Sequence, residues 1–226
     1  MLRFTYEVEP TMAGPMFTRP QAASILGVSM GGIDKLLESR FLGDLKQQAV
    51  LALANSPHVR VLDGRLPVLR TAAHRDATLS DHDDQARKYI GASPTMSDDE
   101  LLQASNRWWR SNPSEILAAG LLVVAISGFI VAVLQVRSLA RSQPDKKGVL
   151  RHAYDASLLC RMDDLADASS KRVCLEGLSP RDKDECLALL GCRVRTVAGG
   201  PIAYVDPAVG AEPPAANVQA LYELGT

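Results

Sequence analysis

Residues 19–40, RPQAASILGVSMGGIDKLLESR, have the pattern of two short amphipathic helices joined by a tight turn. Gly27 can take the positive φ that such a turn needs, and Ser29 stands where the N-cap of a second helix belongs. Ile33 and Leu36 are apolar at spacings that face the first helix. The pattern predicts a helix-turn-helix, which can present its second helix to the major groove of DNA. An ordinary helical hairpin in a globular core is the alternative.

The segment after this motif predicts a third helix and then a β-hairpin. Residues 41–54 are amphipathic, and residues 58–70, HVRVLDGRLPVLR, place apolar side chains on both sides of Asp63-Gly64, a strong hairpin-turn signal. A hairpin that follows a helix-turn-helix is a wing, and its arginines can meet phosphates. The residues predicted to contact DNA are Ser29, Met30 and Lys35 in the groove and Arg40, Arg60, Arg65 and Arg70 on the phosphates.

The strings AASILGVS, IDKLL and VRVLDGRLPV carry a family resemblance. Through them, residues 17–72 resemble the winged helix-turn-helix of MerR-type and excisionase-type DNA-binding proteins. The resemblance implies that the second helix enters the major groove and that the wing lies on the flanking backbone. The second helix departs from the pattern, because Gly31, Gly32, Asp34 and Glu38 stand where such proteins often have Arg, Ser or Thr.

Composition describes a globular protein that can bury a core. The chain has 226 residues, 46% of them hydrophobic and 23% charged, with a net charge of −1. Residues 1–75 carry 9 Lys/Arg against 6 Asp/Glu, and residues 76–106 carry 2 against 7. A mildly basic N-terminal unit therefore precedes an acidic connector, which suits modest DNA affinity.

No cofactor, metal site or catalytic centre is expected. The four cysteines lack the two-residue spacing of a zinc ribbon, so they are predicted to be buried small hydrophobes. The chain contains no phosphate-binding Gly-rich loop, nucleophile elbow or paired-carboxylate signature, so an enzyme is not predicted. Residues 1–18 lack the pattern of a secretory signal, and the cytoplasm is the expected compartment.

Residues 116–136 have two interpretations. Residues 116–134 contain no charged side chain and are long enough for a transmembrane helix, which would make the chain a single-pass membrane-anchored regulator. Ser127-Gly128, however, divides the run into two β-branched segments of ordinary strand length, 121–126 and 129–136. A hairpin is favoured, because a helix predicted at 182–190 and a strand at 202–205 need sheet partners.

The second half of the chain carries another resemblance, through SNRWWRSNPSE, LLVVAISGFIVAVLQV, RVCLEG and LLGCRVRTVAGGPIAYVD. Residues 97–206, which begin with a helix predicted at 95–109, are similar to small bacterial PUA-like β-barrel domains, as in uncharacterised actinobacterial proteins. In PUA-like folds the barrel commonly binds RNA or modified bases, so the resemblance implies such a module as an alternative function.

Together these patterns predict an α+β protein with an N-terminal winged helix-turn-helix and a C-terminal mixed α/β domain that contains a small antiparallel barrel or sheet. The predicted units are a DNA-binding domain at 1–75, an acidic connector at 76–96, an α+β domain at 97–206 and a tail at 207–226. The expected function is DNA binding in transcription regulation, with a C-terminal domain for sensing or partner binding. Double-stranded DNA is the expected partner, and homodimerisation is left open.

Overall fold

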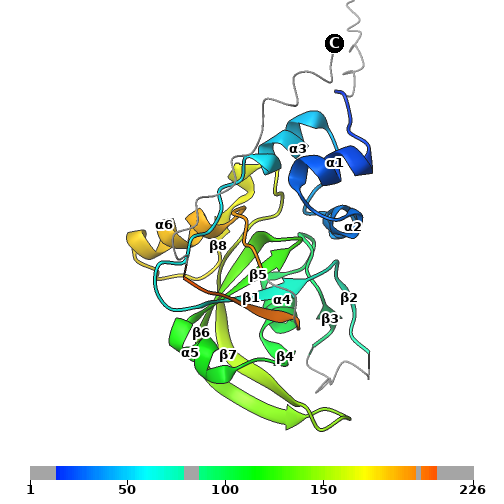
Figure 1. The fold of residues 1–226 in the computed structure, drawn as a ribbon. Helices are drawn as coiled ribbons and strands as arrows, with labels where there is room; N and C mark the ends of the chain where they lie inside the picture. The colour runs from blue at the N-terminus through cyan, green and yellow to red at the C-terminus, as the bar shows by residue number, and fades with distance from the viewer. Residues whose placement is uncertain (1–13, 79–86, 197–199, 208–226) are drawn as a thin grey trace, which may run out of the picture.

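The computed structural model describes residues 14–78, 87–196 and 200–207, and these form a mixed α+β structure around a curled sheet (Figure 1). The helices are α1 (Arg19–Leu26), α2 (Met30–Glu38), α3 (Gln47–Ala54), α4 (Asp98–Ser105), α5 (Pro113–Ala119), α6 (Pro180–Leu189) and the 3-10 helix η2 (Ala168–Ser170). The strands are β1 (Leu66–Thr71), β2 (Arg75–Asp76), β3 (Tyr89–Ile90), β4 (Arg107–Trp109), β5 (Leu121–Ile126), β6 (Phe129–Pro144), β7 (Leu150–Arg161), β8 (Arg172–Val173) and β9 (Ile202–Val205). The acidic run at 81–84 and the predicted tail beyond 207 lie outside the described residues.

The two predicted helices at 19–40 and their turn are confirmed. Thr18 and Gln21 form a capping box at the start of α1, and Gly27 ends it in the left-handed conformation with a φ of 59°. The hydroxyl of Ser29 accepts a hydrogen bond from the backbone N–H of Gly32 at 3.1 Å and so caps α2. The third helix begins at Gln47, later than the amphipathic pattern of 41–54 predicted.

The predicted wing at 58–70 is wrong. Its second half forms β1, which pairs in parallel with β5 and antiparallel with β9 instead of folding back on residues 58–62. Val68 and Leu69 are almost completely buried in this position, a degree of burial that an isolated two-stranded wing does not provide. Since β1 lies inside the sheet, it also crosses the predicted boundary between the N-terminal and C-terminal domains.

The predicted hairpin at 121–136 is confirmed, and the membrane helix is therefore wrong. Strands β5 and β6 pair antiparallel from Leu121↔Gln135 to Ile126↔Phe129. Between them, Ser127 and Gly128 have φ values of 51° and 87°, and two positive φ values are what a two-residue type I′ turn needs. Among the described residues, no helix has the length and apolar character needed to cross a membrane.

The strand pairs formed within 97–206 are antiparallel, as predicted for the C-terminal domain, and the sheet is mixed because β1 joins it from outside that range. Within the described residues its order is β4-β7-β6-β5-β1-β9, β8 adds to β7, and β1 and β5 run parallel. The helix predicted at 95–109 ends at Ser105, and residues 107–109 form β4 instead. One continuous apolar core includes both Leu26 and Leu36 of the N-terminal helices and Phe129 of the sheet. The helices α1–α3 therefore pack on the sheet rather than forming a separate unit.

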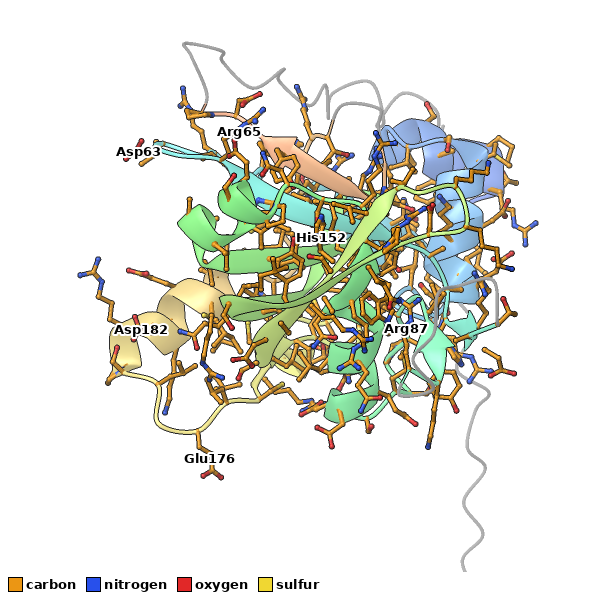
Figure 2. All side chains as sticks on the ribbon, turned by 90° about the horizontal axis from the view of Figure 1, so that it is seen from below. Asp63, Arg65, Arg87, His152, Glu176 and Asp182 are labelled. Carbon is orange, nitrogen blue, oxygen red and sulfur yellow. The ribbon has the colours of Figure 1, made fainter. Side chains whose placement is uncertain are left out.

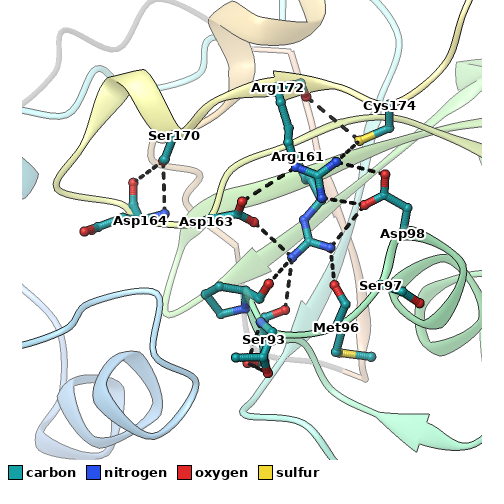
Figure 3. Close-up of polar contacts among 12 residues, drawn as sticks. Ser93, Met96, Ser97, Asp98, Arg161, Asp163, Asp164, Ser170, Arg172 and Cys174 are labelled. Atoms are coloured by element: carbon teal, nitrogen blue, oxygen red, sulfur yellow. Dashed lines mark hydrogen bonds and ion pairs between the residues drawn. The ribbon is translucent and has the colours of Figure 1, made fainter.

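A buried arginine fastens the loop before α4 to the sheet (Figure 3). Arg161, which is fully buried on β7, donates hydrogen bonds to the carbonyls of Ser93, Pro94 and Met96 at 3.2, 2.9 and 2.7 Å. Its guanidinium also lies 3.3 Å from a carboxylate oxygen of Asp98.

Two further charges complete this arrangement. Asp163 lies 3.0 Å from the guanidinium of Arg161, and Arg172 lies 2.6 Å from the carboxylate of Asp98. The hydrogen bond from Arg172 is the main cause that lowers the pKa of Asp98. We call Arg161, Arg172, Asp98 and Asp163 the Arg161 cluster, in which each cation has a carboxylate beside it.

Candidate functional site

A broad groove lies between the helices α1 and α2 and one side of the sheet. Its walls are the α1–α2 turn, the end of β1 with the residues that follow it, the β5–β6 turn and residues 193–196. Its volume is about 1660 Å³, whereas small-molecule pockets are usually about 300–1000 Å³. The groove is therefore large enough for an extended ligand.

The lining of this groove is basic. Among the residues that the structure describes, the lining contains no Asp or Glu, and its basic side chains are Lys35, His58, Arg70, Arg75, Arg193 and Arg195. Several cations that line one concave surface create a positive potential that attracts anions. The groove is thus chemically suited to phosphate or another anionic group.

Two of these arginines also hold the walls of the groove in place. Arg193 donates to the carbonyl of Leu26 at the end of α1, and its guanidinium lies over the ring of Phe129, 5.1 Å from the centroid. Burial lowers the pKa of Arg193, with Arg195 as a second cause. Arg70 donates to the carbonyl of Gly200. Arg193 therefore ties the end of α1 to the β5–β6 hairpin while it adds charge to the groove.

Lys35 and Arg195 are exposed basic residues of the lining, and neither forms a salt bridge within the described part of the chain. His58 lies near the second of them, and its pKa is lowered by burial and then by the charges of Arg193 and Arg195. His58 is therefore mainly neutral at neutral pH. An anion bound beside these arginines would offset their charge and raise the pKa of His58.

Gly32 of α2 has a packing role that the sequence did not reveal. The hydroxyl of Ser127, in the β5–β6 turn, donates to the carbonyl of Gly32 at 2.8 Å. A Cβ at Gly32 would lie 3.2 Å from the Cβ of Val28 and at an ordinary contact distance of 3.5 Å from the hydroxyl of Ser127. The first turn of α2 therefore contacts the β5–β6 turn, and a side chain at position 32 would crowd Val28.

The structure brings together three of the seven predicted DNA contacts. Ser29, Lys35 and Arg70 line the groove. Arg65 lies elsewhere, because it pairs with Asp206 at 2.7 Å and approaches Glu115 at 3.5 Å. Figure 2 shows Arg65 beside the start of β1, away from the N-terminal helices.

The other three predicted contacts are exposed but are not part of the groove lining: Met30, Arg40 and Arg60. Sequence reasoning missed His58, Arg75, Arg193 and Arg195. The alternation Arg193-Val194-Arg195 was a signal for the last two, since it places two arginines on the same side of an extended segment.

Comparison with known proteins adds no family to this description: no protein-family model, curated protein or solved structure matches the chain. The resemblances to MerR-type and excisionase-type proteins and to PUA-like domains remain predictions. The function is therefore argued from the groove itself.

Proposed function

We propose that this protein binds double-stranded DNA and that its groove takes one phosphate backbone, with regulation of transcription as its role. The observation that carries the proposal is the basic lining without a carboxylate among the described residues. The size of the groove supports a polymer over a small anion. The helix-turn-helix contributes Ser29 and Lys35 to this surface, so α2 would lie beside the bound strand.

The surface of α2 supports binding with little base reading. Its exposed positions are Met30, Gly31, Lys35 and Glu38. Only Lys35 and Glu38 among them can hydrogen-bond to base edges, and none is the Arg, Asn or Gln that makes the commonest paired contacts. The affinity would therefore come mainly from phosphate contacts, which position a protein on DNA but carry no direct sequence information.

The proposal predicts how the affinity for DNA depends on salt concentration. If about four groove cations contact phosphates, the logarithm of the binding constant should fall with the logarithm of salt concentration with a slope of about −3.6. Because phosphate contacts dominate, mixed-sequence duplexes should bind within about tenfold of one another, which corresponds to about 1.4 kcal/mol.

Charge reversal in the groove tests the proposal. The variant Lys35→Glu/Arg195→Glu should bind a labelled duplex more than about tenfold more weakly in fluorescence anisotropy, because two attractive contacts become repulsive. The matched control is Arg181→Glu/Lys183→Glu on α6, which makes the same charge change on exposed residues outside the groove lining. The control should stay within about twofold of the unaltered protein, since surface changes of this kind have small effects.

Two results would contradict the proposal. One is equal loss of affinity in the groove variant and the control, which would mean that only overall charge matters. The other is a preference for a simple polyanion, such as heparin, over duplex DNA at the same ionic strength.

A further inference from the structure

The β6–β7 hairpin continues beyond the body of the sheet as an arm, which we define as residues 137–151. Strand β5 pairs with β6 only as far as Leu121↔Gln135, whereas β6 and β7 remain paired out to Pro144↔Leu150. The six residues from 137 to 142 are all exposed. Figure 1 shows this ribbon extending past β4 at the end of the sheet farthest from α1–α3.

The arm is strongly basic. Its cations are Arg137, Arg141, Lys146, Lys147 and Arg151, and Asp145 is its one acidic residue. Asp145 is engaged at the turn, where it accepts hydrogen bonds from the backbone of Lys147 and Val149 and pairs with Arg151 at 2.9 Å. The hydrogen bond from the backbone of Val149 is the main cause that lowers its pKa to about 2.

This pairing leaves Arg137, Arg141, Lys146 and Lys147 without another acidic residue between 137 and 151. On the opposite strand, Asp155 pairs with Ser138 and so lies near Arg137 at the base of the arm. Apolar side chains stand exposed among them: Leu139 is 39% exposed and Leu150 is 54% exposed. Pro144 is also exposed and pairs with Leu150 next to the turn. Cations that surround exposed apolar side chains on a narrow ribbon are the combination by which many proteins hold the minor groove of DNA.

The arm adjoins the wall of the groove through β4. Trp109 of β4 lines the groove, and it pairs with His152 of β7, whose other partner is Ser142 of the arm. Arg141 of the arm lies over the ring of the neighbouring Trp108, 5.9 Å from its centroid. A polymer that leaves the groove beside Trp109 of β4 therefore next meets β7, the neighbouring strand, which carries the arm.

We infer that the arm is a second contact surface for duplex DNA, and that it holds the phosphates and minor groove of the stretch that extends beyond the groove. The inference rests on the proposed function for the kind of ligand, but it depends on different residues. A duplex long enough to reach the arm should bind more tightly than one that fills only the groove. The arm cations should have no effect on the shorter duplex.

The test compares two duplexes, of about one and about three helical turns (about 10 bp per turn), in the full-length protein. The variant Lys146→Glu/Lys147→Glu changes two exposed residues of the turn. It should bind the long duplex about tenfold more weakly, with a salt slope reduced by about two, and the short duplex should be unaffected. The matched control is again Arg181→Glu/Lys183→Glu.

The outcomes separate this inference from the proposed function. If the arm variant binds both duplexes like the unaltered protein while the groove variant loses both, the inference about the arm is wrong and the proposed function stands. If neither variant changes binding, both are wrong. Exposed cations also protect free strand edges from aggregation. If the arm variant loses only solubility and keeps its affinity for the long duplex, the arm cations serve to prevent aggregation and the inference is wrong.

Discussion

The Arg161 cluster and the groove each gather several charged side chains, but they differ in whether carboxylates lie beside the cations. In the cluster, Arg161 and Arg172 lie beside Asp98 and Asp163, and the buried guanidinium also donates to three backbone carbonyls. In the groove, the described lining has basic residues and no carboxylate. The charges of the cluster are balanced by protein partners and hold the fold together, whereas the exposed cations Lys35 and Arg195 of the groove form no ion pair within the described part of the chain.

Burial explains why the two places differ. A guanidinium without exposure to water needs its donors satisfied and its charge balanced, because desolvation costs several kcal/mol. Exposed cations such as Lys35 and Arg195 keep their hydration and need no internal partner. Three experiments test this contrast, taken from the largest expected effect to the smallest.

Replacing Arg161 by Leu should lower the free energy of unfolding by about 3–5 kcal/mol, because it leaves three backbone carbonyls without their donor and leaves Asp98 and Asp163 with Arg172 as their remaining cation. Urea denaturation measures the change. The matched control is Arg172→Leu, whose side chain is 43% exposed, and it should cost no more than about 1 kcal/mol. Equal losses in the two variants would show that burial does not distinguish these arginines.

The variants Arg193→Met and Arg195→Met compare two arginines of the groove, one with contacts to α1 and Phe129 and one that is exposed. The first variant loses the hydrogen bond to the end of α1 and the contact with Phe129, so unfolding should require about 1–3 kcal/mol less. The second should change stability by less than about 0.5 kcal/mol. Both should weaken DNA binding. An unchanged stability for Arg193→Met would mean that this contact does not join the helix-turn-helix to the sheet.

The smallest expected effect is a pH dependence that comes from His58. Its pKa is lowered in the free protein, first by burial and then by Arg193 and Arg195, and phosphate in the groove would raise it. A pKa that is higher in the bound state means proton uptake on binding. The added affinity is therefore complete below the pKa of the free state and is lost as pH rises through the pKa of the bound state.

Anisotropy titrations at several pH values should show affinity for DNA falling by a factor of a few between mildly acidic and neutral pH, since a one-unit pKa shift changes affinity at most about tenfold. His58→Gln should remove this component. If His58→Gln keeps the full pH dependence, another group is responsible and the placement of phosphate beside His58 is wrong.

Local signals predicted several elements correctly. The cap at Ser29 and the turn at Gly27 fix the two N-terminal helices, and Ser127-Gly128 fixes the β5–β6 hairpin, because each depends on backbone conformations and hydrogen bonds within a few residues. The turn signal at Asp63-Gly64 was equally local, but the strand after it, β1, pairs with β5 and β9 instead of with residues 58–62. Burial of Val68 and Leu69 between β5 and β9 outweighed the local hairpin.

The sequence by itself determined the helices α1 and α2, the strand β5, the turn after it and β6 as far as Val136, and the basic character of several segments. The tertiary structure alone decided which basic residues share a surface. Arg70 and Arg65 are five positions apart, yet the first lines the groove and the second pairs with Asp206. Arg193 and Lys35, more than a hundred residues apart, line the same groove. The physical reason is that capping and turn preferences act over a few residues, whereas burial of the sheet selects partners without regard to their distance in sequence.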